Sequence, residues 1–122
     1  MGLLKNRLTD HRPWGSFYQF ALNETFTVKV IVVAPNQRLS LQTHSKRAEF
    51  WYILSGQGEV TVGETVHQAK AGDEFEISIG TAHRAASGTD GLSFLEVSIG
   101  EFDEHDEVRL EDSYGRSSPT SQ

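Results

Sequence analysis

Four polar residues in the middle of the chain have types and spacing suited to binding a metal ion. Gln42 and His44 are two apart in an alternating stretch, so on a strand both side chains point the same way. Glu49 follows a short loop, and His83 lies behind a glycine-containing turn at the end of a later strand. If these strands line one barrel, the four nitrogen and oxygen ligands converge and suit zinc, iron, manganese or nickel.

The alternative is that these residues are ordinary parts of strands. A histidine in a strand is more often packed or solvent-exposed than a ligand, and we interpret His11, His67 and His105 in this way. Gln42 and Glu49 taken alone would equally fit a solvated polar face. The interpretation as a metal site therefore depends on the glycines around them, which are considered below.

The elements that must position these residues are predicted to be short β-strands. Apolar residues recur with a period near two, which is typical of strands and not of helices. Strands are expected at Thr25–Val33, Arg38–His44, Phe50–Leu54, Glu59–Val62, Thr65–Ala69, Glu74–Ile79, Arg84–Ala86 and Leu92–Ile99. Turn signals separate them, including Ser55-Gly56 and Gly63-Glu64. Eight or nine short strands at regular spacing predict an all-β sandwich or barrel.

Length and composition restrict the class of protein. A chain of 122 residues is long enough for one domain, and the absence of cysteine excludes disulfides and thiolate metal sites. The net charge of −6 and the lack of a basic run argue against nucleic-acid binding. There is no apolar stretch of about 20 residues for a membrane helix, and residues 1–11 lack the apolar centre of a signal peptide. We expect a cytoplasmic protein with no membrane or nucleic-acid partner.

The glycines place the four candidate ligands in a known pattern. The first cupin motif is matched by Gln42, His44, Glu49 and Gly56, with glutamine in place of the usual first histidine. The second is matched by Gly72, Gly80 and His83. The chain thus resembles the cupins, and the resemblance implies a single barrel of the double-stranded β-helix or jelly-roll type. It also implies a divalent ion, for which zinc is favoured over manganese, cobalt, nickel or iron.

A closer resemblance extends over most of the chain. The stretches that carry it are Arg12–Phe17, Arg38–His44, Arg47–Trp51, Ser55-Gly56, His83-Arg84 and Asp106–Arg116. In this order they look like type II mannose-6-phosphate isomerase, the cupin domain at the C-terminus of bifunctional mannose-1-phosphate guanylyltransferases. The resemblance implies a cupin domain over residues 12–116, an N-terminal segment over 1–11 and a tail over 117–122, which we expect to be disordered. Residues 101–112 are acid-rich and fit either a short helix or an ordered wrap.

The implied reaction interconverts mannose 6-phosphate and fructose 6-phosphate through an enediol, an aldose–ketose isomerisation. Arg47 lies between two candidate ligands and is the best candidate for gripping the phosphate. Glu96 is a candidate general base if its face of Leu92–Ile99 lines the barrel, and an outward glutamate is the alternative. Lys29 interrupts an apolar strand and enters the pocket as an acid or phosphate ligand, unless its stem snorkels outward. Ser40 shares the face of Gln42 and could bind substrate.

Departures from this family leave other functions open. The family usually has histidine at the positions of Ser45, Lys46 and Phe50, which puts substrate preference or activity in doubt. The alternatives are a non-catalytic cupin that binds metal or sugar phosphate, and another cupin enzyme such as a metal-dependent dioxygenase. A homodimer and a role in polysaccharide or nucleotide-sugar synthesis are expected from the resemblance alone.

Overall fold

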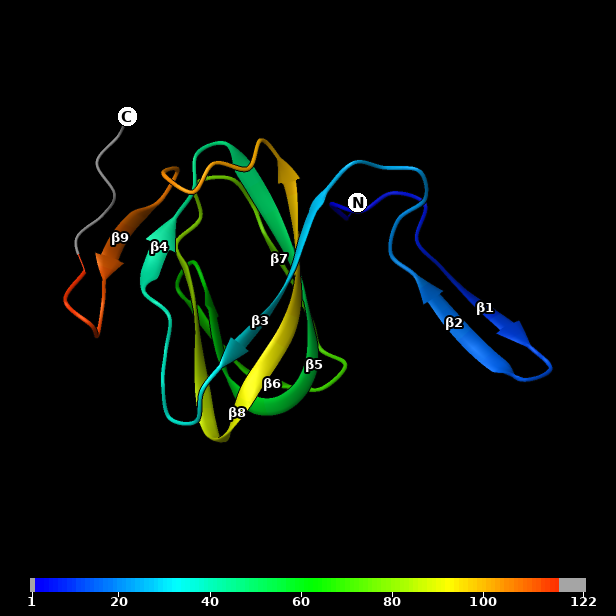
Figure 1. The fold of residues 1–122 in the computed structure, drawn as a ribbon, viewed down its shortest axis with the longest axis horizontal. Coiled ribbons are helices and arrows are strands. Elements are labelled where there is room, and N and C mark those ends of the chain that lie inside the picture. Colours follow the sequence, from blue (N-terminus) through cyan, green and yellow to red (C-terminus); the bar gives the residue numbers. More distant parts are fainter. Residues whose placement is uncertain (1, 117–122) are drawn as a thin grey trace.

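The computed structural model describes residues 2–116 as an all-β protein, in agreement with the predicted fold class (Figure 1). Its strands are β1 (Leu8–Arg12), β2 (Gly15–Gln19), β3 (Thr27–Val33), β4 (Leu41–Thr43), β5 (Arg47–Val62), β6 (Thr65–Lys70), β7 (Glu74–Ile77), β8 (His83–Gly100) and β9 (Val108–Glu111). Within this range no helix is long and apolar enough to cross a membrane. The predicted disordered tail lies outside the described residues.

Two long strands, β5 and β8, build the barrel, and here the prediction of short strands was wrong. Ser55-Gly56 does not end a strand, because β5 continues through it with irregular pairing between Ile53 and Gly58. Gly56 has a φ of +82°, and a Cβ on it would lie 2.1 Å from the carbonyl oxygen of Gly91. The glycine therefore bends the strand and lets the neighbouring strand approach, as bulge glycines do.

All of β3 to β9 belong to one seven-stranded sheet, and the bend gives the two halves of each long strand different neighbours. The first half of β5 pairs with the second half of β8, and β7 and β3 flank them. The second half of β5 pairs with the first half of β8, flanked by β6 and by β4, which in turn pairs with β9. The sheet curves around an apolar core made of Val33, Trp51, Ile53, Val60, Ala69, Ile77, Ala85, Leu92 and Phe94.

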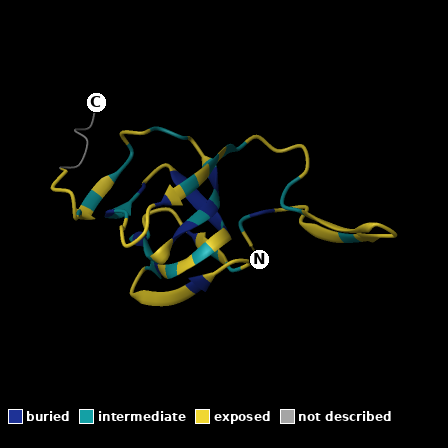
Figure 2. Cartoon of the chain, turned by 60° about the horizontal axis from the view of Figure 1, so that its bottom comes forward, coloured by how far each residue is buried: buried dark blue, intermediate teal, exposed yellow. Residues whose placement is uncertain are grey.

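Three segments of the described chain lie outside the barrel, and they differ in how many contacts they make with it. The acid-rich stretch 101–112 forms an ordered wrap that ends in β9, and not a helix. Near the N-terminus, Leu4 is buried, and the backbone N–H of Leu3 donates to Glu76. Among the described residues, strands β1 and β2 pair only with each other, and they stand away from the barrel (Figures 1 and 2).

Candidate metal and substrate site

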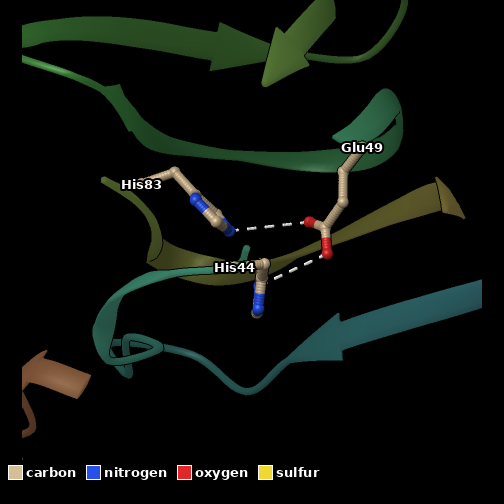
Figure 3. A group of neighbouring side chains, drawn as sticks. All are labelled: His44, Glu49 and His83. Carbon is tan, nitrogen blue, oxygen red and sulfur yellow. Dashed lines mark ion pairs between the residues drawn. The ribbon is translucent and has the colours of Figure 1, made fainter. Parts of the chain in front are cut away.

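Three of the four predicted ligands come together inside the barrel (Figure 3). His44 directly follows β4, Glu49 lies in the first half of β5, and His83 begins β8. Their side chains are almost fully buried, and their candidate ligand atoms all lie within 4.8 Å of one another. The Nε2 atoms of His44 and His83 are 3.4 and 3.6 Å from the two carboxylate oxygens of Glu49. The strands thus bring together two imidazoles and one carboxylate.

The backbone fixes the orientation of both imidazole rings. The Nδ1 of His44 is 2.7 Å from the carbonyl oxygen of Asp106, and the Nδ1 of His83 is 2.9 Å from that of Thr81. A carbonyl only accepts, so each Nδ1 carries the proton and each Nε2 presents a lone pair on the side of Glu49. Burial also lowers the pKa of His83, which favours its neutral form.

These features fit a divalent cation. The Nε2 of His83 is buried and has no hydrogen-bond partner, which is costly for a polar atom unless something binds it. Two neutral imidazoles and a carboxylate are a donor set that zinc and other first-row divalent ions accept. The residues that would hold the ion are therefore His44, Glu49 and His83.

Gln42, the fourth predicted ligand, lies opposite His83 in the β4–β8 pairing. Its Oε1 accepts a hydrogen bond of 2.8 Å from the hydroxyl of Ser40, and both residues line a pocket next to the three ligands. Ser40 is buried, so its hydroxyl holds the amide group of Gln42 in the pocket. Whether Gln42 joins the metal shell stays a prediction.

Arg47 faces the same group, but it is engaged with the ligands. Its Nε donates to Glu49 at 2.9 Å, and its Nη2 lies 3.3 Å from the Nε2 of His44. The ring of Phe102 packs on the guanidinium, with its centroid 4.5 Å away. The side chain is buried and balances the charge of Glu49. Its predicted role as the phosphate ligand is untested, and its contacts equally fit a residue that positions Glu49.

Glu96 and Lys29 both face the inside of the barrel. They are direct partners in the β3–β8 ladder, and Glu96 is also the partner of the buried Trp51 across β5 and β8. Only 8% of Glu96 is exposed, so the alternative of an outward glutamate does not apply. Burial, and then the negative charge of Glu49, raise the pKa of Glu96 to about 7, although Arg47 and Lys29 oppose the shift. The Nζ of Lys29 lies 4.0 Å from the ring centroid of Phe102.

The pocket holds residues that the sequence analysis did not assign. It has a volume of about 210 Å³ and is lined by Lys29, Ile31, Leu39, Ser40, Gln42, Arg47, Glu96, Glu107, Arg109 and Arg116. Arg109 lies opposite Gln42 in the β4–β9 pairing and forms an ion pair of 2.9 Å with Glu107. Both residues belong to the acid-rich segment 101–112, for which the sequence did not decide between a helix and a wrap, so the direction of their side chains could not be predicted. A larger cavity of about 570 Å³, lined by Arg7, Tyr18 and Tyr52 among others, contains none of the predicted site residues.

The three positions where the resemblance leads one to expect histidine have other partners here. The carboxylate of Asp106 accepts hydrogen bonds from the backbone N–H groups of Ser45 and Lys46 and from the Ser45 hydroxyl. Lys46 also pairs with Asp103 on the wrap. Phe50 is fully buried, belongs to a separate apolar cluster and packs its ring on Phe20. A histidine at position 50 would therefore lie on the opposite face of β5 from Glu49.

A bent antiparallel barrel with two histidines and a glutamate gathered inside it defines a cupin. Similar solved structures include oxalate decarboxylase from Bacillus subtilis, with a TM-score of 0.65 and 25% identity over 71% of this chain and 24% of that chain. The cupin-2 domain Rru_A2000 from Rhodospirillum rubrum has a TM-score of 0.61 and 23% identity over 80% of this chain and 71% of that chain. Within the cupins, the chain belongs to the family described as mannose-6-phosphate isomerase C-terminal, whose model matches residues 3–112.

The sequence similarity to three curated proteins supports the same family assignment. The xanthan biosynthesis protein XanB of Xanthomonas campestris is 41% identical over 88% of this chain, and the alginate biosynthesis protein AlgA of Pseudomonas putida is 40% identical over 93%. The mannose-1-phosphate guanylyltransferase ManC of Salmonella typhimurium is 36% identical over 87%. The match covers 23%, 24% and 22% of these relatives, so this chain spans about a quarter of their length.

Proposed function

We propose that this chain is a metal-dependent isomerase that interconverts mannose 6-phosphate and fructose 6-phosphate. Membership of the family supports the substrate class. The observation that carries the proposal is the position of Glu96, a buried carboxyl group with a pKa of about 7 beside the His44–Glu49–His83 group. An isomerase of this kind needs a base within reach of the substrate with a pKa near the working pH, and burial moves the pKa of Glu96 toward that range.

The proposed reaction moves one proton between two neighbouring carbons. The ionised carboxylate of Glu96 takes the proton from C2 of the open-chain aldose, and the electrons of that C–H bond form the double bond of an enediol. The C1 oxygen takes up the proton that the C2 hydroxyl gives up, and the carboxyl group returns its proton to C1 as the C2 oxygen becomes the carbonyl of the ketose. A bound divalent ion would stabilise the negative charge that develops on the substrate oxygens, and His44, Glu49 and His83, with Gln42 as a fourth, would hold it.

Two cationic side chains of the pocket are candidates for binding the phosphate group of the substrate. Lys29 on β3 and Arg109 on β9 line the same 210 Å³ pocket as Glu96. A phosphate dianion needs cations and hydrogen-bond donors, and a guanidinium supplies two in parallel. We infer that Lys29 and Arg109 hold the phosphate and that Arg47 positions Glu49, with Ser40 orienting Gln42 near the sugar. Lys29→Met should therefore raise KM at least tenfold, more than it lowers kcat.

Four finer points belong to the same proposal. Zinc is the favoured resident ion, since two imidazoles and a carboxylate are common zinc ligands. The working unit is a homodimer, and its compartment is the cytoplasm. The names of the relatives XanB and AlgA place those proteins in xanthan and alginate biosynthesis, and we propose a comparable role in polysaccharide precursor synthesis for this chain.

A coupled assay tests the proposal. Purified protein is stripped with chelator, reloaded with zinc, manganese, cobalt, nickel or iron, and supplied with mannose 6-phosphate. We expect turnover with at least one ion and a loss of 10²–10⁴-fold in kcat for Glu96→Gln. Glu64→Gln, at the exposed β5–β6 turn, is the matched control and should keep full activity. Tight sugar-phosphate binding without turnover would indicate a binding module, and oxygen uptake with iron would indicate a dioxygenase.

A further inference from the structure

The guanidinium group of Arg47 engages the lone pair with which His44 would bind an ion. The Nδ1 of His44 donates to the carbonyl oxygen of Asp106, so its Nε2 is the acceptor in the 3.3 Å contact with Nη2 of Arg47. An imidazole nitrogen has one lone pair, which either accepts a hydrogen bond or binds a cation. The hydrogen bond from Arg47 and the binding of a metal ion therefore exclude each other at His44.

The same guanidinium group also neutralises Glu49. Its Nε donates to Oε2 of Glu49 at 2.9 Å, and this oxygen lies 3.4 Å from Nε2 of His44 (Figure 3). One guanidinium group thus bridges two of the candidate ligand atoms. The side chain of Arg47 is 7% exposed, and those of His44 and Glu49 are 2% and 1% exposed, so water hardly screens the charges. The positive charge of Arg47 would therefore repel a divalent cation at these ligands.

Glu49 has a second donor besides Arg47. The indole N–H of Trp51 donates to the other carboxylate oxygen, Oε1, at 3.0 Å. Trp51 is fully buried and its ring stacks on Phe94, with the centroids 4.3 Å apart, which fixes the position of the N–H group. The carboxylate of Glu49 therefore keeps a fixed donor when Arg47 turns to another partner.

A second set of partners for Arg47 is available in the pocket. Arg47 lines the 210 Å³ pocket that contains Lys29 and Arg109, and it lines a second pocket that shares these two cations. The ring of Phe102 packs on its guanidinium group, with the centroid 4.5 Å away. Such a ring supports the face of a guanidinium group and leaves the N–H groups at its edges able to change partners. A phosphate group held by Lys29 and Arg109 would present an anion to Arg47.

We propose that Arg47 couples metal binding to substrate binding, because the anionic substrate draws its guanidinium group away from His44 and Glu49 and so releases these ligands for the ion. The inference rests on the proposed function, since it takes the pocket to bind a sugar phosphate. Coupling between two binding events is reciprocal, so the ion also raises the affinity for the substrate.

The coupling is measured with a ligand that binds without reacting. Sorbitol 6-phosphate carries a phosphate group on an open six-carbon chain but has no carbonyl group, so it cannot be isomerised. Zinc affinity is determined by competition with a chromogenic chelator, without ligand, with sorbitol 6-phosphate, and with uncharged sorbitol. We expect sorbitol 6-phosphate to tighten zinc binding roughly tenfold or more, and sorbitol to have no effect. An unchanged zinc affinity at saturating sorbitol 6-phosphate would overturn the proposal.

Arg47→Met distinguishes competition from the mere positioning of Glu49. If Arg47 competes with the ion, this variant should bind zinc at least as tightly as the wild type, and sorbitol 6-phosphate should change its affinity by less than about threefold. Loss of a residue that only orients a metal ligand would instead weaken zinc binding by about 10–100-fold, and that result would also overturn the proposal. Lys70→Met, which removes an exposed cation on β6, is the matched control and should keep the coupling of the wild type.

Two comparisons keep the test decisive. Far-UV circular dichroism checks that Arg47→Met is folded, and the measurement on the wild type needs no variant. The isomerase assay is run on the same samples, so the two proposals fail in different ways. Turnover of mannose 6-phosphate by a wild type that shows no coupling would refute the role of Arg47 and leave the isomerase standing. Coupling without turnover would support the role of Arg47 and refute the isomerase.

Discussion

Glu96 and Lys29 occupy opposite positions in the β3–β8 ladder, and both line one pocket of the barrel together with Gln42 and Arg47. The carboxyl group of Glu96 therefore lies between an ammonium group on one neighbouring strand and the influence of the buried Glu49 on the other. The raised pKa of Glu96 follows from this burial and from Glu49, and it has a consequence for stability as well as for activity.

Glu96 should make the metal-free protein less stable as the pH rises. Its folded pKa of about 7 lies above its ordinary value of 4.5, so between these values the folded state keeps a proton that the unfolded state has lost. The free energy of unfolding should fall across pH 4.5–7, by up to about 3 kcal/mol. Glu96→Gln should be more stable than the wild type at pH 8 and equal to it at pH 4, as measured by urea unfolding. A constant difference across this range would contradict the buried, ionisable Glu96.

Removing an imidazole should remove the metal. His83→Ala should weaken zinc binding at least a hundredfold in calorimetric titration, because two ligands cannot replace three in a buried site. His67→Ala is the matched control, since His67 lies exposed on β6, outside the ligand group. Unchanged stoichiometric zinc binding in His83→Ala would refute the assignment.

Asp106 should affect zinc affinity because it holds the backbone next to the ligand His44. Its carboxylate holds the N–H groups of Ser45 and Lys46, and its carbonyl oxygen holds the ring of His44. Asp106→Ala should loosen the wrap and weaken zinc binding by about 10–100-fold, as the loss of residues that orient metal ligands does. Glu104→Gln, an exposed change on the same wrap, should have no effect. Equal zinc affinities in the two variants would show that the wrap does not position His44.

The bend of β5 should be sensitive to a single methyl group. Gly56→Ala requires a left-handed backbone and places Cβ 2.1 Å from the Gly91 carbonyl oxygen, so it should cost more than about 2 kcal/mol. Gly63→Ala also needs a positive φ, but its nearest neighbour is 3.9 Å away. This control should cost about 1 kcal/mol. Thermal unfolding compares the two, and equal costs would show that close packing at Gly56 is unimportant.

The sequence predicted the site better than the strands that build it. The ligands His44, Glu49 and His83 were predicted from spacing that survives any error in strand length, because each lies next to a turn or loop. The continuity of β5 and β8 could not be predicted. A glycine can end a strand or bend a strand that continues, and the surrounding sequence does not distinguish the two cases.

The wrap shows a second limit of the sequence. The orientation of Arg109 depends on its pairing with Gln42 across β9 and β4, a contact between residues 67 positions apart (109 − 42) that leaves no local pattern. The same is true of the Asp106 carbonyl, whose contact with His44 spans 62 positions. The inward face of Glu96 was one of two alternatives until the β3–β8 register decided between them.

The most direct measurement follows the proton itself. Mannose 6-phosphate is converted by the zinc-loaded protein in D2O, and the product is examined by NMR. The account predicts fructose 6-phosphate that carries solvent deuterium at C1, formed by the wild type and reduced at least a hundredfold in Glu96→Gln. Conversion at full rate by Glu96→Gln, or no conversion by the wild type with any divalent ion, would contradict it.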